Sequence, residues 1–203
     1  MDIPHTVTTP KQVSGVETSG DHSPLAWLQR AEREGTSLAD ALEMFDSLPA
    51  APMHEMPGRW RGGGLHTGHV LDGLLEAFGW YGKSFVDRET VHPLLFHYGE
   101  DVIAINPQWL PVALAGRLKL QHRRSAIAMF KSAKALIATK QPAARLREVS
   151  CRGVMTSAMV YDRQPIIDFF RMVAPGVLLG LMDYRDHAPL FFTLRKTSAP
   201  GPA

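Results

Sequence analysis

The final third of the chain most constrains the fold, because it is a series of short β-like runs that are apolar on both faces. Turn residues separate four runs that we predict to be strands: Arg145–Arg152, Val154–Asp162, Val177–Tyr184 and Pro189–Lys196. In the second run, Met155 and Met159 fall on one face and Ala158 on the other. Strands that are buried on both sides require helices over one face and a closed interior against the other. The predicted fold is therefore α+β: a strongly curled or closed antiparallel β-barrel, covered by helices from the N-terminus and the middle of the chain.

Two helices are predicted before the barrel from their capping residues. The pair Ser23 and Pro24 is typical of a helix start, and this helix ends at Gly35. Ser37, followed by Asp40 in the capping-box position, starts a second helix. Both helices carry an apolar face that needs a partner surface, so we expect them to pack on the main body as a lid or plug.

The middle of the chain is predicted to contain a strand, a helix, a β-hairpin and a second helix. These are Met56–His66, a helix bearing Leu71, Leu74, Leu75 and Phe78, the runs Leu94–Tyr98 and Val102–Asn106, and Ser125 to about Thr139. Gly79 and Gly82 are interpreted as the end of the first of these helices. Ile166–Val173 is ambiguous, since its β-rich composition also fits a helical face.

The cysteine count and the hydropathy of the chain limit the classes of protein to which it can belong. The single cysteine, Cys151, excludes an internal disulfide and a Cys-based zinc site. The first residues, MDIPHTVTTPKQVSG, have no basic head followed by an apolar run, as a secretory signal would. No apolar stretch approaches the roughly 18 residues that are needed to cross a bilayer. We therefore expect a cytoplasmic protein.

The formal net charge of +2 conceals a basic segment. Residues 116–152 contain ten Lys/Arg and one acid, Glu148, so this segment carries +9 and leaves −7 for the remainder. Such a segment could attract an anionic ligand, a membrane surface or a nucleic acid. A solvated helix face is the favoured interpretation, because no aromatic residues interleave with the charges as they do in single-strand binders.

The run GRWRGGG, residues 58–64, is unusually rich in glycine. It lacks the GxxxxGK[ST] pattern of a phosphate loop, and it does not fit the GxGxxG fingerprint followed by a βαβ unit. The three successive glycines instead predict a strand that bends sharply or meets another backbone closely. In lipocalin-like barrels a Gly-x-Trp plugs the closed end under a basic side chain, so we expect Trp60 to do this with Arg195 or Lys196.

A longer resemblance is carried by several stretches. GRWRG, TGHVLDGLLEAFGWYGK and VHPLLF resemble the GXWXG family, and ARLREVSCRGVMTSAMVYDRQPIIDFFRMV with LLGLMD is similar to the domain of unknown function that accompanies it. The resemblance implies a compact two-part module and brings no settled activity. We divide the chain into a disordered leader (1–22), a helical segment (23–50), the GXWXG module (51–112), a basic helical connection (113–142) and a C-terminal β-rich module (143–197), and expect 51–197 to form one composite domain.

His66, His69 and Asp72 are spaced three residues apart at the start of the first mid-chain helix. Histidines beside a carboxylate can act as general acid and base. The structural alternative is that Asp72 stabilises the first helical turn and His66 satisfies buried backbone groups. A metal site with His92 or His97 is a further alternative. Its spacing matches no established ligand pattern, so we predict no metal and no cofactor.

Other side chains are candidates for ligand binding. Lys83 could be buried, where it would bind a carboxylate or form a Schiff base, or exposed at a helix C-terminus, which we favour. Asp168 and Arg171 could pair, either structurally or around an anionic ligand. The predicted ligand-binding residues are Trp60, Glu76, Trp80, Lys83, Met155, Met159, Tyr161, Asp168 and Arg171.

Three functions are compatible with these features. The leading hypothesis is that the chain forms a small calycin-like barrel, which binds a small apolar or amphipathic molecule inside it. The alternative is a cofactor-independent enzyme, an isomerase, cyclase or hydrolase, that acts on a hydrophobic metabolite through His66, His69 and Asp72. A third hypothesis, binding of nucleic acid or an acidic partner by the basic segment, is disfavoured and predicts affinity that falls steeply with salt.

Overall fold

The computed structural model describes residues 23–109 and 124–198. Its helices are α1 (Pro24–Glu34), α2 (Leu38–Ser47), α3 (Leu74–Ala77) and α5 (Arg124–Ala133), with 3₁₀ turns η1 (Met53–Glu55), η2 (Pro107–Trp109) and η4 (Lys134–Ile137). Its strands are β1 (Gly58–Gly64), β2 (Trp80–Phe85), β3 (Val91–Tyr98), β4 (Asp101–Ala104), β5 (Ala144–Cys151), β6 (Val154–Tyr161), β7 (Ile166–Ala174), β8 (Val177–Tyr184) and β9 (Leu190–Lys196). The predicted disordered leader, 1–22, lies outside the described residues.

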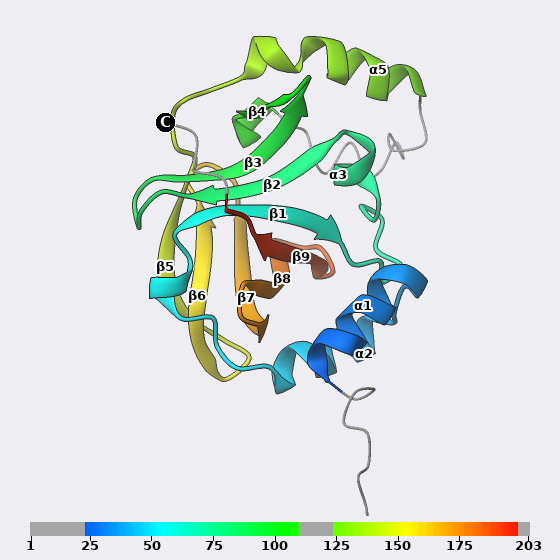
Figure 1. Cartoon of the computed structure of the whole chain (residues 1–203), viewed down its shortest axis with the longest axis vertical. Coiled ribbons are helices and arrows are strands. Elements are labelled where there is room, and N and C mark those ends of the chain that lie inside the picture. The colour runs from blue at the N-terminus through cyan, green and yellow to red at the C-terminus, as the bar shows by residue number, and fades with distance from the viewer. Residues whose placement is uncertain (1–22, 110–123, 199–203) are drawn as a thin grey trace, which may run out of the picture.

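Within the described ranges, eight strands close into an antiparallel barrel (Figure 1). The strands follow one another around the ring in the order β2-β1-β9-β8-β7-β6-β5-β3, and pairing of β2 with β3 joins the two ends. The contact between β3 and β5 is short, with Val91 opposite Ala144. β4 extends from β3 as the second arm of the predicted hairpin. The prediction of a closed antiparallel barrel with N-terminal and middle helices is confirmed.

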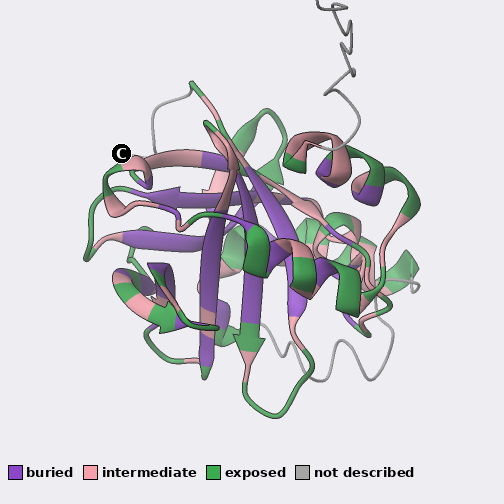
Figure 2. Ribbon diagram, turned by 90° about the horizontal axis from the view of Figure 1, so that it is seen from below, coloured by how far each residue is buried: buried purple, intermediate pink, exposed green. Residues whose placement is uncertain are grey.

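Side chains alternate between the barrel interior and its outer wall, as the pleat of a strand requires. On β7, Phe170 belongs to the interior cluster, whereas Phe169 belongs to the cluster on the outside. Most of the barrel strands are buried along much of their length, as Figure 2 shows in purple. The ambiguous run Ile166–Val173 is therefore a strand, and its mixed pattern arises because both of its faces are covered.

α1 and α2 cover the outer wall of the barrel (Figure 1). Leu28 and Phe45 are fully buried there, and the Phe45 ring meets the Phe191 ring edge-on at 6.0 Å. The predicted caps are confirmed, since the hydroxyls of Ser23 and Ser37 each accept a backbone N–H from the first turn of their helix. The two helices thus pack on the main body from outside and leave its interior free. No helix in the described ranges is both long and apolar enough to span a membrane.

The helix predicted after the first strand is wrong in extent. α3 is a single turn, and Trp80–Phe85 is strand β2, which lies between β1 and β3. Gly79 and Gly82, interpreted as a helix end, adopt positive φ angles of 80° and 145° at the start and middle of this region. The helix-like spacing within residues 71–78 has another cause: these apolar side chains face a cavity, which is described below.

Cys151 ends β5 in the layer that packs against α1 and α2. Burial raises the pKa of its thiol, which disfavours the reactive thiolate. We expect a thiol reagent to label the native protein at neutral pH at least about 100-fold more slowly than the unfolded protein. A time course of labelling with and without guanidinium measures this at one site, because the chain has a single cysteine. Equal rates would contradict the packing of this layer.

Candidate functional site

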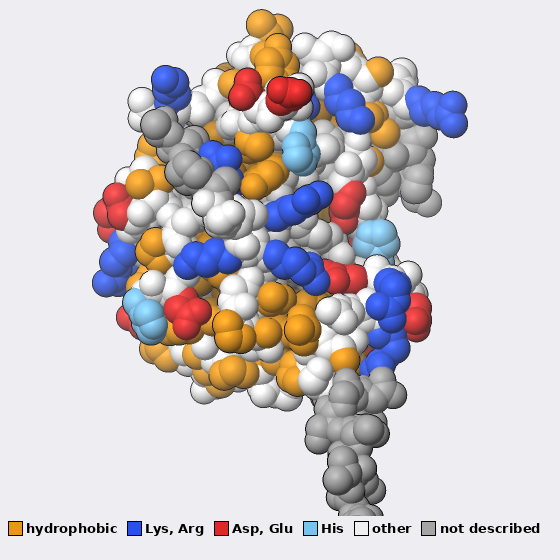
Figure 3. All heavy atoms as spheres, viewed as in Figure 1, with side chains coloured by type: hydrophobic (Ala, Val, Ile, Leu, Met, Phe, Trp, Pro, Cys, Tyr) orange, Lys and Arg blue, Asp and Glu red, His pale blue; other side chains and the backbone are white. Residues whose placement is uncertain are grey.

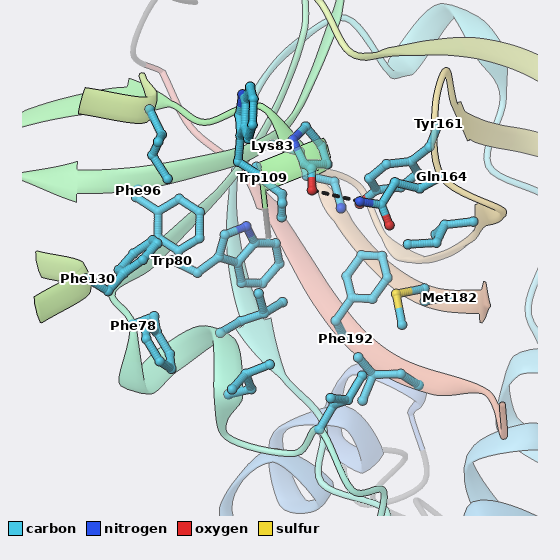
Figure 4. Close-up of a pocket in the computed structure, with 18 of the residues that line it drawn as sticks. Phe78, Trp80, Lys83, Phe96, Trp109, Phe130, Tyr161, Gln164, Met182 and Phe192 are labelled. Atoms are coloured by element: carbon cyan, nitrogen blue, oxygen red, sulfur yellow. Dashed lines mark hydrogen bonds between the residues drawn. The ribbon is translucent and has the colours of Figure 1, made fainter. Parts of the chain in front are cut away.

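The barrel interior holds a cavity of about 420 Å³ that α3 and α5 cover (Figure 4). Its volume lies within the range of small-molecule sites. The strands contribute Trp80, Lys83, Leu94, Phe96, Tyr161, Ile166, Asp168, Met182, Leu190 and Phe192 to its lining. The covering segments and loops contribute Leu71, Leu74, Leu75, Phe78, Pro107, Trp109, Ala126, Met129, Phe130, Ala133, Ile137 and Gln164. Most of these side chains are apolar, and many are aromatic.

Lys83 and Asp168 form a buried ion pair in the cavity wall. Lys83 Nζ lies 2.8 Å from Asp168 Oδ2 and donates a hydrogen bond to the carbonyl of Pro93 at 3.3 Å. The two side chains are only 3% and 1% exposed. The interpretation of Lys83 as an exposed residue at a helix end is wrong, because this segment is a strand and its side chain points into the barrel. The pair brings one positive and one negative charge into an otherwise apolar site.

Tyr161 is a third polar side chain beside this ion pair. Its ring centre lies 5.9 Å from Lys83 Nζ, and its side chain interacts with the Asp168 carboxyl group. Burial raises the pKa of Asp168, and Lys83 and Tyr161 act in the opposite direction. Burial and the charge of Asp168 raise the pKa of Tyr161 well above its usual value. Tyr161 therefore keeps its proton at neutral pH and can act as a hydrogen-bond donor.

Aromatic rings surround the ammonium group of Lys83. Its Nζ lies 4.8 Å from the ring centre of Phe192 and 5.5 Å from that of Trp80, distances typical of cation–π contacts. Trp80 Nε1 is itself buried and donates to no other described residue. Indole N–H groups usually find a partner when buried, so Trp80 carries an unpaired donor that lies behind the surface of the cavity wall.

Trp60 is fully buried in the interior cluster and lies outside the cavity lining. Its Nε1 donates to the carbonyl of Met56 at 2.8 Å, and Lys196 Nζ lies 5.4 Å from the ring centre. Lys196 is thus the basic residue over Trp60. Arg195 instead pairs with Glu32 of α1 at 2.7 Å on the outer wall. These contacts fit the expected plug, and they place Trp60 in the packed part of the interior.

Three other predicted ligand-binding residues lie away from the cavity. Met159 is buried in the interior cluster, Met155 is 59% exposed, and Arg171 is buried on the outer side of the wall. The Arg171 guanidinium lies 5.1 Å from the ring centre of Phe45. The predicted pairing of Asp168 with Arg171 is wrong, because residues three apart on a strand point to opposite faces.

The predicted acid–base residues shape a loop beside the barrel. One Asp72 carboxylate oxygen accepts the backbone N–H groups of residues 67–69, each at 2.9 Å. Burial lowers the pKa of His69, and the exposed His66 lies 3.8 Å from the carboxylate of Glu76. None of these four side chains lines the cavity. Their catalytic role, and with it the enzyme alternative, stays a prediction without support from this geometry.

In the described part of the basic segment, residues 124–152, three of the seven basic side chains pair with acids. The pairs are Arg145 with Asp162 at 2.8 Å, Arg147 with Glu89 at 2.9 Å and Arg152 with Asp46 at 2.6 Å. Figure 3 shows positive and negative side chains interspersed over one face of the molecule. This face therefore lacks the field of a single sign that steers nucleic acid to a protein. The basic residues before Arg124 lie outside the described ranges.

The helix predicted from Ser125 proved to be part of the site, which sequence reasoning did not foresee. α5 begins one residue earlier, at Arg124, and presents Phe130 to the cavity. The Phe130 ring meets those of Phe78 and Phe96 edge-on at 5.0 and 5.2 Å. The sequence signal was limited to an apolar helical face, because Ala126, Met129, Phe130 and Ala133 recur at helical spacing.

Comparison with known proteins agrees with the resemblance seen in the sequence. The family model described as GXWXG protein matches residues 43–100, and the model described as Domain of unknown function (DUF4334) matches residues 142–196. No match was found among curated proteins. A crystal structure of a protein from Thermomonospora curvata is similar, with 31% sequence identity and a TM-score of 0.63 over 85% of this chain and 95% of that chain. The chain therefore belongs to the family in which a GXWXG domain is followed by a DUF4334 domain.

Proposed function

We propose that this chain binds one small apolar molecule with a neutral polar end inside the barrel cavity. The observation that carries the proposal is an apolar cavity of about 420 Å³ whose polar groups converge at one place. These groups are the Lys83–Asp168 pair and the Tyr161 hydroxyl. A mostly apolar wall with a few convergent polar groups is the usual chemistry of a small-molecule site.

The charge of the cavity favours a neutral ligand. Asp168 already neutralises Lys83 at 2.8 Å. A ligand carboxylate would have to displace Asp168 or add an unpaired negative charge to a buried site, and both are unfavourable. An alcohol, ketone or aldehyde needs only a hydrogen bond, which the third N–H of the Lys83 ammonium can donate, because Asp168 and the Pro93 carbonyl take the other two.

A series of linear primary alcohols tests this proposal. The neutral dye Nile red serves as a fluorescent probe, and each alcohol is titrated as a competitor. Affinity is expected to rise by about fourfold per CH₂ group, from about 0.8 kcal/mol each, until the cavity is full. The carboxylate of the same chain length is expected to bind at least about tenfold more weakly at neutral pH. A protein that binds neither dye nor alcohol, or prefers the carboxylate, would contradict the proposal.

A blocking variant distinguishes the cavity from the surface. Met182 lines the cavity, so Met182→Trp places a large ring in the space of the ligand. We expect decanol to bind this variant at least about tenfold more weakly, a loss of about 1.4 kcal/mol or more. Met155→Trp is the matched control, because Met155 is 59% exposed, and its affinity should change by less than about twofold. Equal affinities for both variants would place the binding site elsewhere; thermal unfolding verifies that both variants fold.

A further inference from the structure

We propose that Lys83 captures its ligand covalently, by forming a reversible Schiff base with the carbonyl group of an apolar aldehyde or ketone in the cavity. This inference rests on the proposed function and narrows the ligand to a carbonyl compound. Lys83 has the two properties that the reaction needs, an amine in the wall of the cavity and apolar surroundings.

The position of Lys83 distinguishes it from the other lysines that the structure describes. Lys131, Lys140 and Lys196 are exposed at the surface. Lys134 is buried, but its Nζ donates to the carbonyl of His97 and it does not line the cavity. Among the described lysines, Lys83 is therefore the one that a ligand in the cavity would meet.

Asp168 can accept the proton that the Lys83 ammonium must lose before the amine can react. In the pair, the Lys83 ammonium gives a proton to the Asp168 carboxylate at 2.8 Å, and the neutral amine attacks the carbonyl carbon. The resulting carbinolamine takes the proton back on its hydroxyl and releases water as the C=N bond forms. The product is a protonated imine beside the Asp168 carboxylate, so that one water leaves and the net charge of the site is unchanged.

The Asp168 carboxyl group, once it holds the proton, can donate a hydrogen bond to the carbonyl oxygen during this step. Tyr161, whose hydroxyl stays protonated, hydrogen-bonds this carboxyl group, and its ring centre lies 5.9 Å from Lys83 Nζ. A hydrogen bond to the carbonyl oxygen makes its carbon more electrophilic and stabilises the developing negative charge.

Reductive trapping tests the inference. The protein is mixed with about one equivalent of decanal and sodium cyanoborohydride, and intact mass spectrometry with peptide mapping locates the secondary amine. We expect one adduct, on Lys83, to form at least about tenfold faster than adducts on all other lysines together. Lys83→Arg, which keeps the cation but has no nucleophilic amine, should lose this adduct, whereas the control Lys134→Arg should keep it.

Measurements on the wild-type protein alone distinguish failure of the Lys83 capture from failure of the proposed function. A binding titration with decanol on the same preparation measures non-covalent binding independently of any variant. If decanol binds but the label is spread over exposed lysines, the capture by Lys83 is refuted and the proposed function stands. If decanol does not bind, the proposed function itself fails, and a Lys83 adduct would then show a reactive amine without a binding site.

Discussion

Replacing Lys83 with Met is expected to lower the free energy of unfolding by about 3–5 kcal/mol. The substitution leaves the Asp168 side chain, which is 1% exposed, without the cation 2.8 Å away. An unpaired charge in an apolar interior is costly, because water no longer solvates it and no partner compensates it. Urea denaturation of the wild type and the variant at neutral pH measures the difference.

The double variant Lys83→Met with Asp168→Leu is the control for this loss. It replaces the pair with apolar side chains in the company of Trp80 and Phe192, so no charge remains in the wall. Replacing both members of a buried pair is often neutral or stabilising by about 1–4 kcal/mol, so the double variant should recover most of the lost stability. If its loss of stability equals the sum of the losses in Lys83→Met and in Asp168→Leu alone, the ion pair is not the origin of the effect.

The pH dependence of the Lys83→Met variant has a definite sign. Burial raises the pKa of Asp168, and Lys83 is the larger of the two influences that lower it. Without Lys83, the pKa in the folded state rises further above the unfolded value of about 4. A carboxyl group with a raised pKa contributes stability at low pH that is lost as the pH increases. The penalty of this substitution should therefore be smaller at about pH 5 than at about pH 8, and the reverse trend would contradict a carboxylate as its cause.

Features with local causes were predictable from the sequence. Ser23 and Ser37 cap their helices through hydroxyl contacts within one turn, so the residues that determine these boundaries are neighbours in the chain. The strands of the last third follow from β-rich runs between turn residues. These strands are apolar on both faces, which indicated a closed sheet. One face must pack against helices, and the other must face the interior of the barrel.

Features that depend on distant partners were not predictable. The Lys83 side chain is buried because β7 brings Asp168 to it across the interior, and nothing near Lys83 in the sequence signals this pairing. Conversely, the proximity of Asp168 and Arg171 in the sequence suggested a pair, but the strand separates them onto opposite faces. Of the predicted ligand residues, Trp80, Lys83, Tyr161 and Asp168 line the cavity. The contribution of α5 was missed, because an apolar helical face does not reveal which surface it covers.

Strand β2 was not foreseen, because Gly79 before it and Gly82 within it were interpreted as a helix end. Gly82→Ala gives the second large effect: it is expected to lower the free energy of unfolding by more than about 3 kcal/mol. Gly82 has a φ of 145°, and a Cβ atom there would lie 2.0 Å from the carbonyl oxygen of Trp60 and 2.7 Å from the amide nitrogen of Gly62. Both atoms belong to the backbone of the paired strand β1, so no side-chain rotation relieves the clash. The two strands would have to separate at the point where β2 closes the barrel.

Gly153→Ala is the matched control for this close approach. Gly153, in the turn between β5 and β6, also has a positive φ, 81°, but a Cβ atom there would meet nothing within 4 Å. Its substitution should therefore cost only the backbone strain of about 1–2 kcal/mol. Urea denaturation of both variants separates this strain from the clash between strands. Because β2 also carries Trp80 and Lys83, only Gly82→Ala should weaken decanol binding as well. Equal losses of stability in the two variants would show that backbone conformation, and not the approach of β1 to β2, requires glycine at this position.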